Sequence, residues 1–451
     1  MPGFTQELAS FLTGLATTDV PEAEAATIRR GLTDLVGVIL AGSEHSAVRA
    51  ARAARGSSSG HAHLIPDGGM VAPEDAALIN GIAGHALDYD DTGLDGHPSA
   101  VLGPALLARG EALDASADAV LRAYRVGYEA WGALWRHAPV PLHGRGWHPS
   151  SVFGAVAAAA ACIALRRPDA LCMRNAIGLG AAEAAGLVAN FGTMAKPYQV
   201  GRAARAGLIA ADLAEAGMDA APDILEHSKG FFGSFAGGMR SEIQLGGTLA
   251  QEGISIKLYP VCYAAHRIVD AALELQSTAA IPPDDIDRIH VRIGATQLGM
   301  LRNHRPATTL EAKFSAQYAV VAPLLFGRLS NRELAPDRVA SAAAQSLMAR
   351  VTLEPVEERL PGQPFSPYDQ VTLTSKTVRS IASSHVVDAS GCHARPPSED
   401  TLWAKFRDNA MVRLSEDEAR RAFRAFADLG GSQPVSAAMQ TLLLSTCSGR
   451  H

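Results

Sequence analysis

The most polar patch of an otherwise apolar helical stretch runs from His85 to Thr92, and His97 follows it closely. If the patch continues the helix, His85 and Asp88 share one face and Thr92 lies one turn beyond Asp88, so their side chains converge. A buried aspartate costs several kcal/mol unless it is paired, so we expect a cation beside Asp88. Because imidazole changes charge near about pH 6.5, the patch could carry general acid–base chemistry.

Two other interpretations of this acidic patch remain open. Its carboxylates could cap the solvated end of a helix, or they could bind Mg²⁺ that holds a diphosphate, as Asp-rich helices do in all-helical prenyl-transferring enzymes. The magnesium interpretation requires a second acidic motif on a facing helix, and the sequence contains none with suitable spacing. We therefore expect no metal ion here.

Three further segments place a basic residue just ahead of a predicted helix. The basic residues are His148, Lys196 and Lys257, and a proline follows each of them within a few positions. A helix N-terminus carries partial positive charge, so a cation beside it is favoured only when an anion binds between them. Three such segments indicate a carboxylate or phosphate pocket. Ordinary surface basic residues ahead of helices are the alternative interpretation.

Cys262 and His266 lie one turn apart on the helix predicted after Lys257. Two ligands are too few for a metal site, and an isolated cysteine is more often a small core residue than a nucleophile. The glycine-rich stretch at 230–238 lacks the strand-then-helix setting of a dinucleotide-binding fold. No G-x-S-x-G, Walker or H-E-x-x-H motif occurs in the sequence. We therefore expect no cofactor.

The composition is typical of a soluble globular protein. The 451 residues include 40 Lys plus Arg and 46 Asp plus Glu, and this net charge of −6 argues against a nucleic-acid binder, which usually has a basic face. The longest uncharged apolar run, 152–165, is shorter than the roughly 18–20 residues that span a bilayer, so no membrane segment is expected. Five widely spaced cysteines without a C-x-x-C indicate neither disulfides nor zinc, and a reducing cytoplasm fits best.

Helical periodicity dominates the chain up to about residue 274, where apolar residues recur at spacings of three and four. The clearest predicted helices are 28–41, 73–87, 117–135, 152–165 and 202–216. Residues 156–165 are apolar on every side, so this segment should lie at the centre of a helical body. We expect a mainly α protein in which residues 1–274 form a large all-helical domain.

The pattern changes after Thr278. A breaker cluster at 281–285 precedes an alternating segment at 286–293, which predicts a strand. The other predicted elements are strands at 349–353, 370–373 and 380–387 and a helix at 334–348. These features indicate a smaller α+β domain at 275–394.

The last part of the chain is again helical in pattern. Ser398 follows a pair of prolines and is suited to be the N-cap of a helix at 399–412. More helix is expected through Leu444. Residues 395–451 should therefore form helices that return to the helical domain.

Several of these motifs, in their order along the chain, resemble those of the MmgE/PrpD family. They are NGIAGHALDYDDT at 80–92, HPS at 97–99, GWH at 146–148, KP at 196–197, KLYP at 257–260 and FSAQY at 314–318. Members of this family include 2-methylcitrate dehydratase, cis-aconitate decarboxylase and iminodisuccinate epimerase. The resemblance implies a large all-helical domain, a smaller α+β lid, a homodimer, and a cofactor-free site in the cleft between the domains for a small di- or tricarboxylate.

The resemblance also carries site residues over, position by position. The expected catalytic residues are His97, His148, Lys257, Lys196, Asp88 and Tyr318, and the expected substrate-binding residues are Thr92, Cys262, His85 and Gln199. Two of these positions depart from the family pattern. Cys262 stands where the decarboxylase-like pattern has a histidine, and Gln199 also replaces a common histidine. The change at Cys262 argues against decarboxylation, which relies on that histidine.

The three family activities share one chemical problem, a carbanion next to a carboxylate. Such carbon acids are very weak, so the site needs a positioned base and cations that stabilise the doubly charged aci-carboxylate as it forms. Lys196 and Lys257 suit the second role. His97 and His148 are the natural proton carriers.

The remaining polar residues would support this chemistry. Asp88 would orient a histidine, while Thr92 and Tyr318 would hydrogen-bond the substrate or a departing hydroxide. We expect loss of water from a hydroxylated di- or tricarboxylate first, epimerisation of a dicarboxylate second and decarboxylation third. A non-catalytic dimeric helical scaffold is the alternative from a different class of protein.

Overall fold

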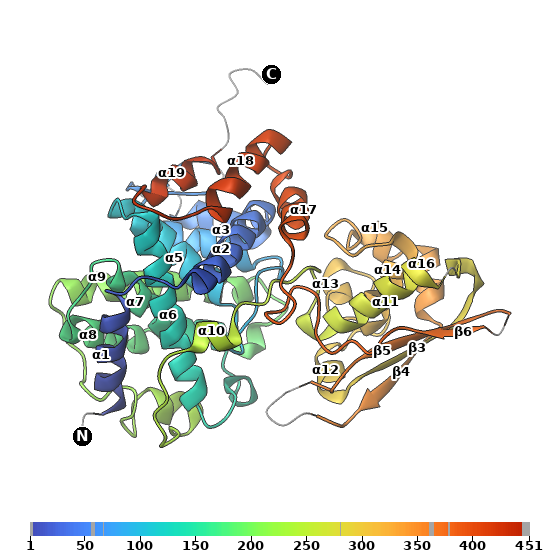
Figure 1. Ribbon diagram of the computed structural model, residues 1–451, viewed down its shortest axis with the longest axis horizontal. Coiled ribbons are helices and arrows are strands. Elements are labelled where there is room, and N and C mark those ends of the chain that lie inside the picture. Colours follow the sequence, from blue (N-terminus) through green and yellow to red (C-terminus); the bar gives the residue numbers. More distant parts are fainter. Residues whose placement is uncertain are drawn as a thin grey trace. The chain divides into compact units, whose positions relative to one another are not determined.

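The chain divides into two compact units in a computed structural model that describes residues 3–55, 59–65, 67–279, 281–359, 365–377 and 379–443. One unit comprises Met1–Ile256 with Ser398–His451, and the other comprises Lys257–Pro397. Helices build nearly all of the first unit, whereas the second combines helices with a four-stranded sheet, so the fold is mainly α with a smaller α+β part (Figure 1). None of the described helices is long and apolar enough to cross a membrane.

The first unit is a bundle around one buried helix. Its helices are α1 (Phe4–Leu15), α2 (Glu22–Gly42), α3 (Ser46–Arg55), α4 (Pro73–His85), α5 (Pro98–Ala112), α6 (Ala117–His137), α7 (Pro149–Ala164), α8 (Ala170–Ala182), α9 (Ala195–Glu215), α10 (Thr248–Glu252), α17 (Glu399–Ala410), α18 (Glu416–Ala427) and α19 (Val435–Gln440). Every residue of α7 is buried, and α5, α6, α8 and α9 pack around it. A Cβ at Gly207 of α9 would lie 2.3 Å from the Cβ of Ala158, so glycine permits this close approach. The prediction of a central apolar helix is confirmed.

Helix α4 ends at His85, two residues before its predicted end. Asp88 has a φ of 54°, in the left-handed region, where a right-handed helix cannot continue. The polar patch is therefore a loop between α4 and α5, and the prediction that His85, Asp88 and Thr92 share a helical face is wrong. Strands β1 (Ala62–His63) and β2 (Met70–Val71) form a hairpin that was not predicted, because such short strands leave no alternating pattern.

The second unit packs helices on a four-stranded sheet of order β4-β3-β5-β6. Its elements are α11 (His266–Thr278), β3 (Ile286–Gly294), α12 (Ala295–Met300), α13 (Thr309–Ala312), α14 (Ala316–Phe326), α15 (Pro336–Val339), α16 (Ala342–Met348), β4 (Val351–Val356), β5 (Gln370–Ser375) and β6 (Ser380–Ala382). Strand β3 pairs with β4 in parallel and with β5 antiparallel. Its alternate residues Ile289, Val291 and Ile293 are buried in the core, as the alternating sequence pattern predicts.

The borders of the second unit differ from the expected ones. The unit begins at Lys257, and the expected border at 274 falls inside α11, because α11 packs on α14 and β5. Cys262 precedes a short 3₁₀ turn and α11 begins at His266, so the two do not share one helix. The single helix expected at 334–348 is two short helices, since Ser341 caps the start of α16. Strand β6 ends at Ala382, earlier than predicted.

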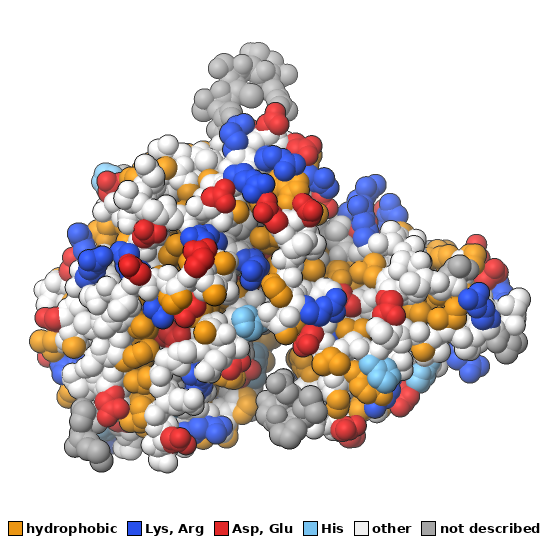
Figure 2. Space-filling model, viewed as in Figure 1, with side chains coloured by type: hydrophobic (Ala, Val, Ile, Leu, Met, Phe, Trp, Pro, Cys, Tyr) orange, Lys and Arg blue, Asp and Glu red, His pale blue; other side chains and the backbone are white. Residues whose placement is uncertain are grey.

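The C-terminal helices belong to the first unit, where α17 and α18 pack against α2. Ser398 caps α17 by accepting a hydrogen bond from the Thr401 N–H, as predicted, and α17 ends at Ala410. Leu444, the expected end of the last helical segment, lies outside the described residues. On the face drawn in Figure 2, acidic and basic side chains are interspersed over this unit, in keeping with the net charge of −6.

Candidate active site

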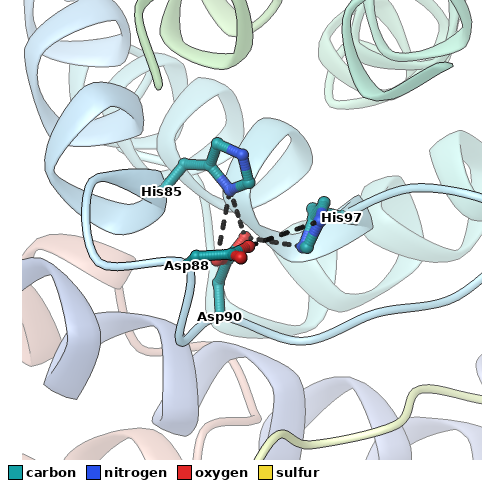
Figure 3. Close-up of side chains that lie close together, drawn as sticks. All are labelled: His85, Asp88, Asp90 and His97. Carbon is teal, nitrogen blue, oxygen red and sulfur yellow. Dashed lines mark hydrogen bonds and ion pairs between the residues drawn. The ribbon is translucent and has the colours of Figure 1, made fainter. Parts of the chain in front are cut away.

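The loop between α4 and α5 gathers four ionisable side chains, His85, Asp88, Asp90 and His97 (Figure 3). The loop is held by its backbone, because Thr92 exchanges both backbone hydrogen bonds with Ser255. Asp88, together with Leu94 and Asp95, has a positive φ, a conformation that non-glycine residues adopt at an energetic cost. Such strained backbone is common where side chains must be aimed at one point.

Asp90 lies between the two histidines of this loop. Its Oδ2 atom is 2.9 Å from Nδ1 of His85 and 3.1 Å from Nδ1 of His97. Burial by itself would raise the pKa of Asp90, but the two imidazoles beside it hold that pKa well below its usual range. Burial raises the pKa of the neighbouring Asp91 to about 8, so at neutral pH the negative charge resides on Asp90. The sequence reasoning missed Asp90, because only the turn of the loop places it between the rings.

The contacts of His97 fix which of its nitrogens carries the proton. Nδ1 lies 2.8 Å from the backbone oxygen of Asp91 as well as close to Asp90. Both neighbours can only accept, so Nδ1 is protonated, and the lone pair of the neutral form of His97 is on Nε2. That Nε2 atom is 4.0 Å from Oδ1 of Asp88. His97 is therefore oriented by Asp90 and the Asp91 carbonyl.

Lys196 supplies the cation expected beside Asp88, with its Nζ 3.1 Å from Oδ1 of that residue. This prediction is confirmed. The ammonium group also lies 5.2 Å from the centre of the Phe191 ring. Lys196 belongs to the first turn of α9 and does not precede the helix, so its charge stands where the helix dipole favours an anion. The side chains of Lys196 and Asp88 are 13% and 14% exposed, which leaves them accessible to a small ligand.

His148 occupies the N-cap of α7, as expected from its place before Pro149. The ring is buried, and its Nδ1 lies 3.0 Å from Nε2 of Gln199. Burial and then the nearby His85 and Lys196 hold the pKa of His148 well below its usual range. His148 is therefore neutral. Gln199, which was expected to bind substrate, contacts the ring of His148.

Two further predicted residues lie in the same loop region. The hydroxyl of Thr92 donates to the backbone oxygen of Gly96 at 3.2 Å, and this bond helps to close the loop. Burial, opposed in part by Asp90, lowers the pKa of His85 to about 4. Neutral His85 donates its Nδ1–H to Asp90, and its buried Nε2 has no hydrogen-bond partner among the residues that the structure describes. This nitrogen can accept a hydrogen bond from a ligand.

The remaining predicted residues belong to the second unit. Lys257 is its first residue and is buried, and half-buried Cys262 donates its backbone N–H to the Lys313 carbonyl. Tyr318 lies in the core of that unit, where its hydroxyl donates to the backbone oxygen of Glu333. Its hydroxyl hydrogen is thus used within the unit and its ring is fully buried, and the role of Tyr318 toward substrate stays a prediction.

Comparison with known proteins places the chain in a family. The MmgE/PrpD N-terminal domain matches residues 6–244, and the MmgE/PrpD C-terminal domain matches residues 259–429. Among relatives, the chain is 29% identical over 393 residues to the cis-aconitate decarboxylase of Homo sapiens, which covers 83% of this chain and 80% of that protein. It is 28% identical over 440 residues to the Mus musculus protein of the same name, which covers 92% and 88%. The corresponding figures for the Aspergillus terreus cis-aconitate decarboxylase are 28% over 360 residues, with 72% of each covered. The two domain matches together cover most of the chain, which therefore belongs to the MmgE/PrpD family of enzymes.

Proposed function

We propose that this protein is a lyase that forms a carbanion next to a carboxylate of a small di- or tricarboxylic acid, and that its reaction is the loss of water. One observation carries the proposal. Nε2 of His97, a base with a fixed lone pair, and the ammonium group of Lys196 both lie within 4.0 Å of the same oxygen of Asp88. A base beside a cation is what removal of a proton next to a carboxylate requires.

The proposed reaction uses these groups in order. His97 takes the proton from the carbon next to the substrate carboxylate, and Lys196 stabilises the negative charge that develops on the carboxylate oxygens. The carbon–oxygen bond then breaks, a carbon–carbon double bond forms, and the proton held by His97 leaves with the hydroxide as water. Lys257 is proposed as the second cation, and it follows Ser255, the pairing partner of Thr92, by two positions.

Decarboxylation of a tricarboxylate is the second candidate, favoured by the names of the relatives. In that reaction the electrons of a carbon–carbon bond stay behind as the carbanion, and the same cations would stabilise it. Cys262, where the decarboxylase-like family pattern has a histidine, argues against it. Epimerisation of a dicarboxylate is the third candidate, since it also begins with removal of such a proton. From the family resemblance we further propose a cytoplasmic homodimer.

A panel of citrate-like and aspartate-like acids, incubated with the protein in D₂O and followed by NMR, separates the three reactions. An alkene signal supports the loss of water. Release of CO₂ indicates a decarboxylase instead, and deuterium incorporated without any net loss indicates an epimerase. If none of these changes appears with any acid of the panel, the proposed chemistry is wrong.

Replacing Lys196 by glutamine is expected to lower kcat/KM by about 10- to 100-fold, because a hydrogen bond to a charged group contributes roughly 1.5–3 kcal/mol. Two effects contribute to the lower kcat/KM: the substrate carboxylate loses a cation, and the negative charge of Asp88 loses its partner. The measurement is steady-state kinetics on the best acid of the panel. Lys229→Gln, at an exposed lysine, is the matched control. An unchanged kcat/KM in Lys196→Gln would remove this lysine from the proposed mechanism.

Chelation of metal ions is expected to leave turnover unchanged. One nitrogen or oxygen atom from each of His85, Asp88, Asp90 and His97 lies within 4.8 Å of the others, a grouping that could hold a metal. However, Nδ1 of His97 faces a backbone carbonyl and both Nδ1 atoms face Asp90, so these nitrogens carry protons and cannot bind a metal together with Asp90. Activity is measured after dialysis against EDTA. A loss that Zn²⁺, Mn²⁺ or Mg²⁺ restores would show that the cluster binds metal.

A further inference from the structure

Gln199 is held in one orientation by four hydrogen bonds. It lies on α9 and is 5% exposed. Its Oε1 atom accepts from the backbone N–H of Leu187 at 2.7 Å and from Nδ2 of Asn190 at 3.0 Å. A backbone N–H can only donate, so the oxygen of the amide must face Leu187. The NH₂ group then donates to the Leu187 carbonyl at 3.3 Å and points at Nδ1 of His148 at 3.0 Å.

This orientation decides the protonation of His148. Because the NH₂ group of Gln199 donates, Nδ1 of His148 must accept, and the proton of the neutral ring sits on Nε2. A doubly protonated ring would set two N–H groups against each other. The charged and titratable groups around the ring are His85 of α4, His97 of the loop, Lys196 of α9 and His143 ahead of α7, and each disfavours a positive charge on His148.

The two histidines therefore have opposite tautomers. His97 carries its proton on Nδ1 and presents a lone pair at Nε2, whereas His148 presents an N–H at Nε2. We propose that Gln199 is a positioning residue that holds His148 as a neutral Nε2–H donor, so that His148 stabilises the developing negative charge while His97 takes the proton. The tautomer of His148 follows from the hydrogen bonds alone. The catalytic role that we give to this tautomer rests on the proposed function.

The test replaces one atom. In Gln199→Glu the side chain keeps an oxygen for Leu187 and Asn190, but the NH₂ group that faces His148 becomes a second carboxylate oxygen. That oxygen accepts, so His148 should move its proton to Nδ1 and become easier to protonate. The matched control is Asn190→Ala, which removes a hydrogen bond to the same amide and does not touch His148.

The readout is ¹⁵N NMR of protein labelled at its histidines, with the His148 signals assigned from their absence in His148→Gln. We expect both the wild type and Asn190→Ala to show an Nε2–H tautomer of neutral His148 at neutral pH. In Gln199→Glu we expect an Nδ1–H tautomer that titrates at higher pH. Activity should fall about 10- to 100-fold in Gln199→Glu, by analogy with the loss caused when the partners that orient metal-bound histidines are replaced.

Each outcome has a separate meaning. An Nδ1–H tautomer in the wild type overturns the proposal even if Gln199→Glu fails to fold, and so does a tautomer that does not change in a folded Gln199→Glu. An Nε2–H signal that flips in this variant supports the positioning role whether or not any acid of the panel reacts. Failure of every acid would count against the proposed function alone, because the NMR measurement needs no substrate.

Discussion

Replacing His97 by glutamine is expected to lower kcat by about 10²- to 10⁴-fold, the contribution that a positioned acid–base group usually makes. Glutamine can still donate a hydrogen bond to Asp90, so the loop keeps its partner, but it cannot take up a proton at neutral pH. KM should change far less than kcat, because the loss concerns the reacting proton and leaves the cations in place. The measurement is kcat on the best acid of the panel.

A matched control and a combined variant sharpen this test. His227 is exposed, and His227→Gln should retain wild-type turnover. Asp90→Asn should lower kcat as well, because an amide carries no negative charge to stabilise the His97 ring when it takes up a proton, and the NH₂ group would face the Nδ1–H of His85. If Asp90 acts through His97, adding Asp90→Asn to His97→Gln costs little further activity. Additive losses would mean that Asp90 has a role of its own, and a folded His97→Gln with normal kcat would exclude His97 as the base.

The sequence predicts the helical body well because its signals are local. The apolar run that becomes α7 has no polar face, so it can only be buried, and the structure buries all of it. The alternation that becomes β3 likewise reports a strand with one buried side. Sequence patterns of this kind depend only on neighbours within a few residues. The short hairpin of β1 and β2 leaves no such signal, and it was missed.

The site was less predictable because its geometry depends on distant contacts. A cation beside Asp88 was expected from charge alone, and the structure shows that this cation is Lys196. Sequence spacing could not show that Asp90 is the carboxylate that contacts the two histidines. Asp90 faces them only because the chain turns at Asp88, which has a positive φ. The contact of Tyr318 could not be predicted for a related reason, because its partner is a backbone carbonyl fifteen positions away that no motif reveals.

The loop that carries the site is also anchored from the far end of the chain. Lys405 of α17 donates from Nζ to the backbone oxygen of Tyr89 at 2.9 Å, and the same nitrogen lies 4.0 Å from the centre of the Tyr89 ring. Lys405 also forms an ion pair with Asp34 of α2, and both side chains are buried. One ammonium group thus joins two helices to the residue that precedes Asp90. Removing it should affect stability and catalysis in distinguishable ways.

Lys405→Met is expected to destabilise the protein by about 3–5 kcal/mol, because it leaves a buried carboxylate without its partner. The measurement is urea unfolding at several pH values. Burial, opposed by Lys405, raises the pKa of Asp34 to about 6, so below that pH the folded protein already holds Asp34 neutral and the variant should lose less. Above about pH 6 Asp34 is charged, and Lys405 compensates this buried charge. The free energy of unfolding lost in Lys405→Met should therefore grow as the pH rises.

Asp34→Asn separates the two roles of this lysine. On its own it keeps the bond from Lys405 to Tyr89, so kcat should stay close to that of the wild type. Combined with Lys405→Met it removes the uncompensated charge, and it should recover most of the lost stability because buried ion pairs often contribute little net stabilisation. The double variant should still turn over more slowly than Asp34→Asn, since the Tyr89 carbonyl has lost its anchor and the loop that aims Asp90 at His97 is freer to move. Full recovery of both stability and kcat would mean that Lys405 serves only to balance Asp34.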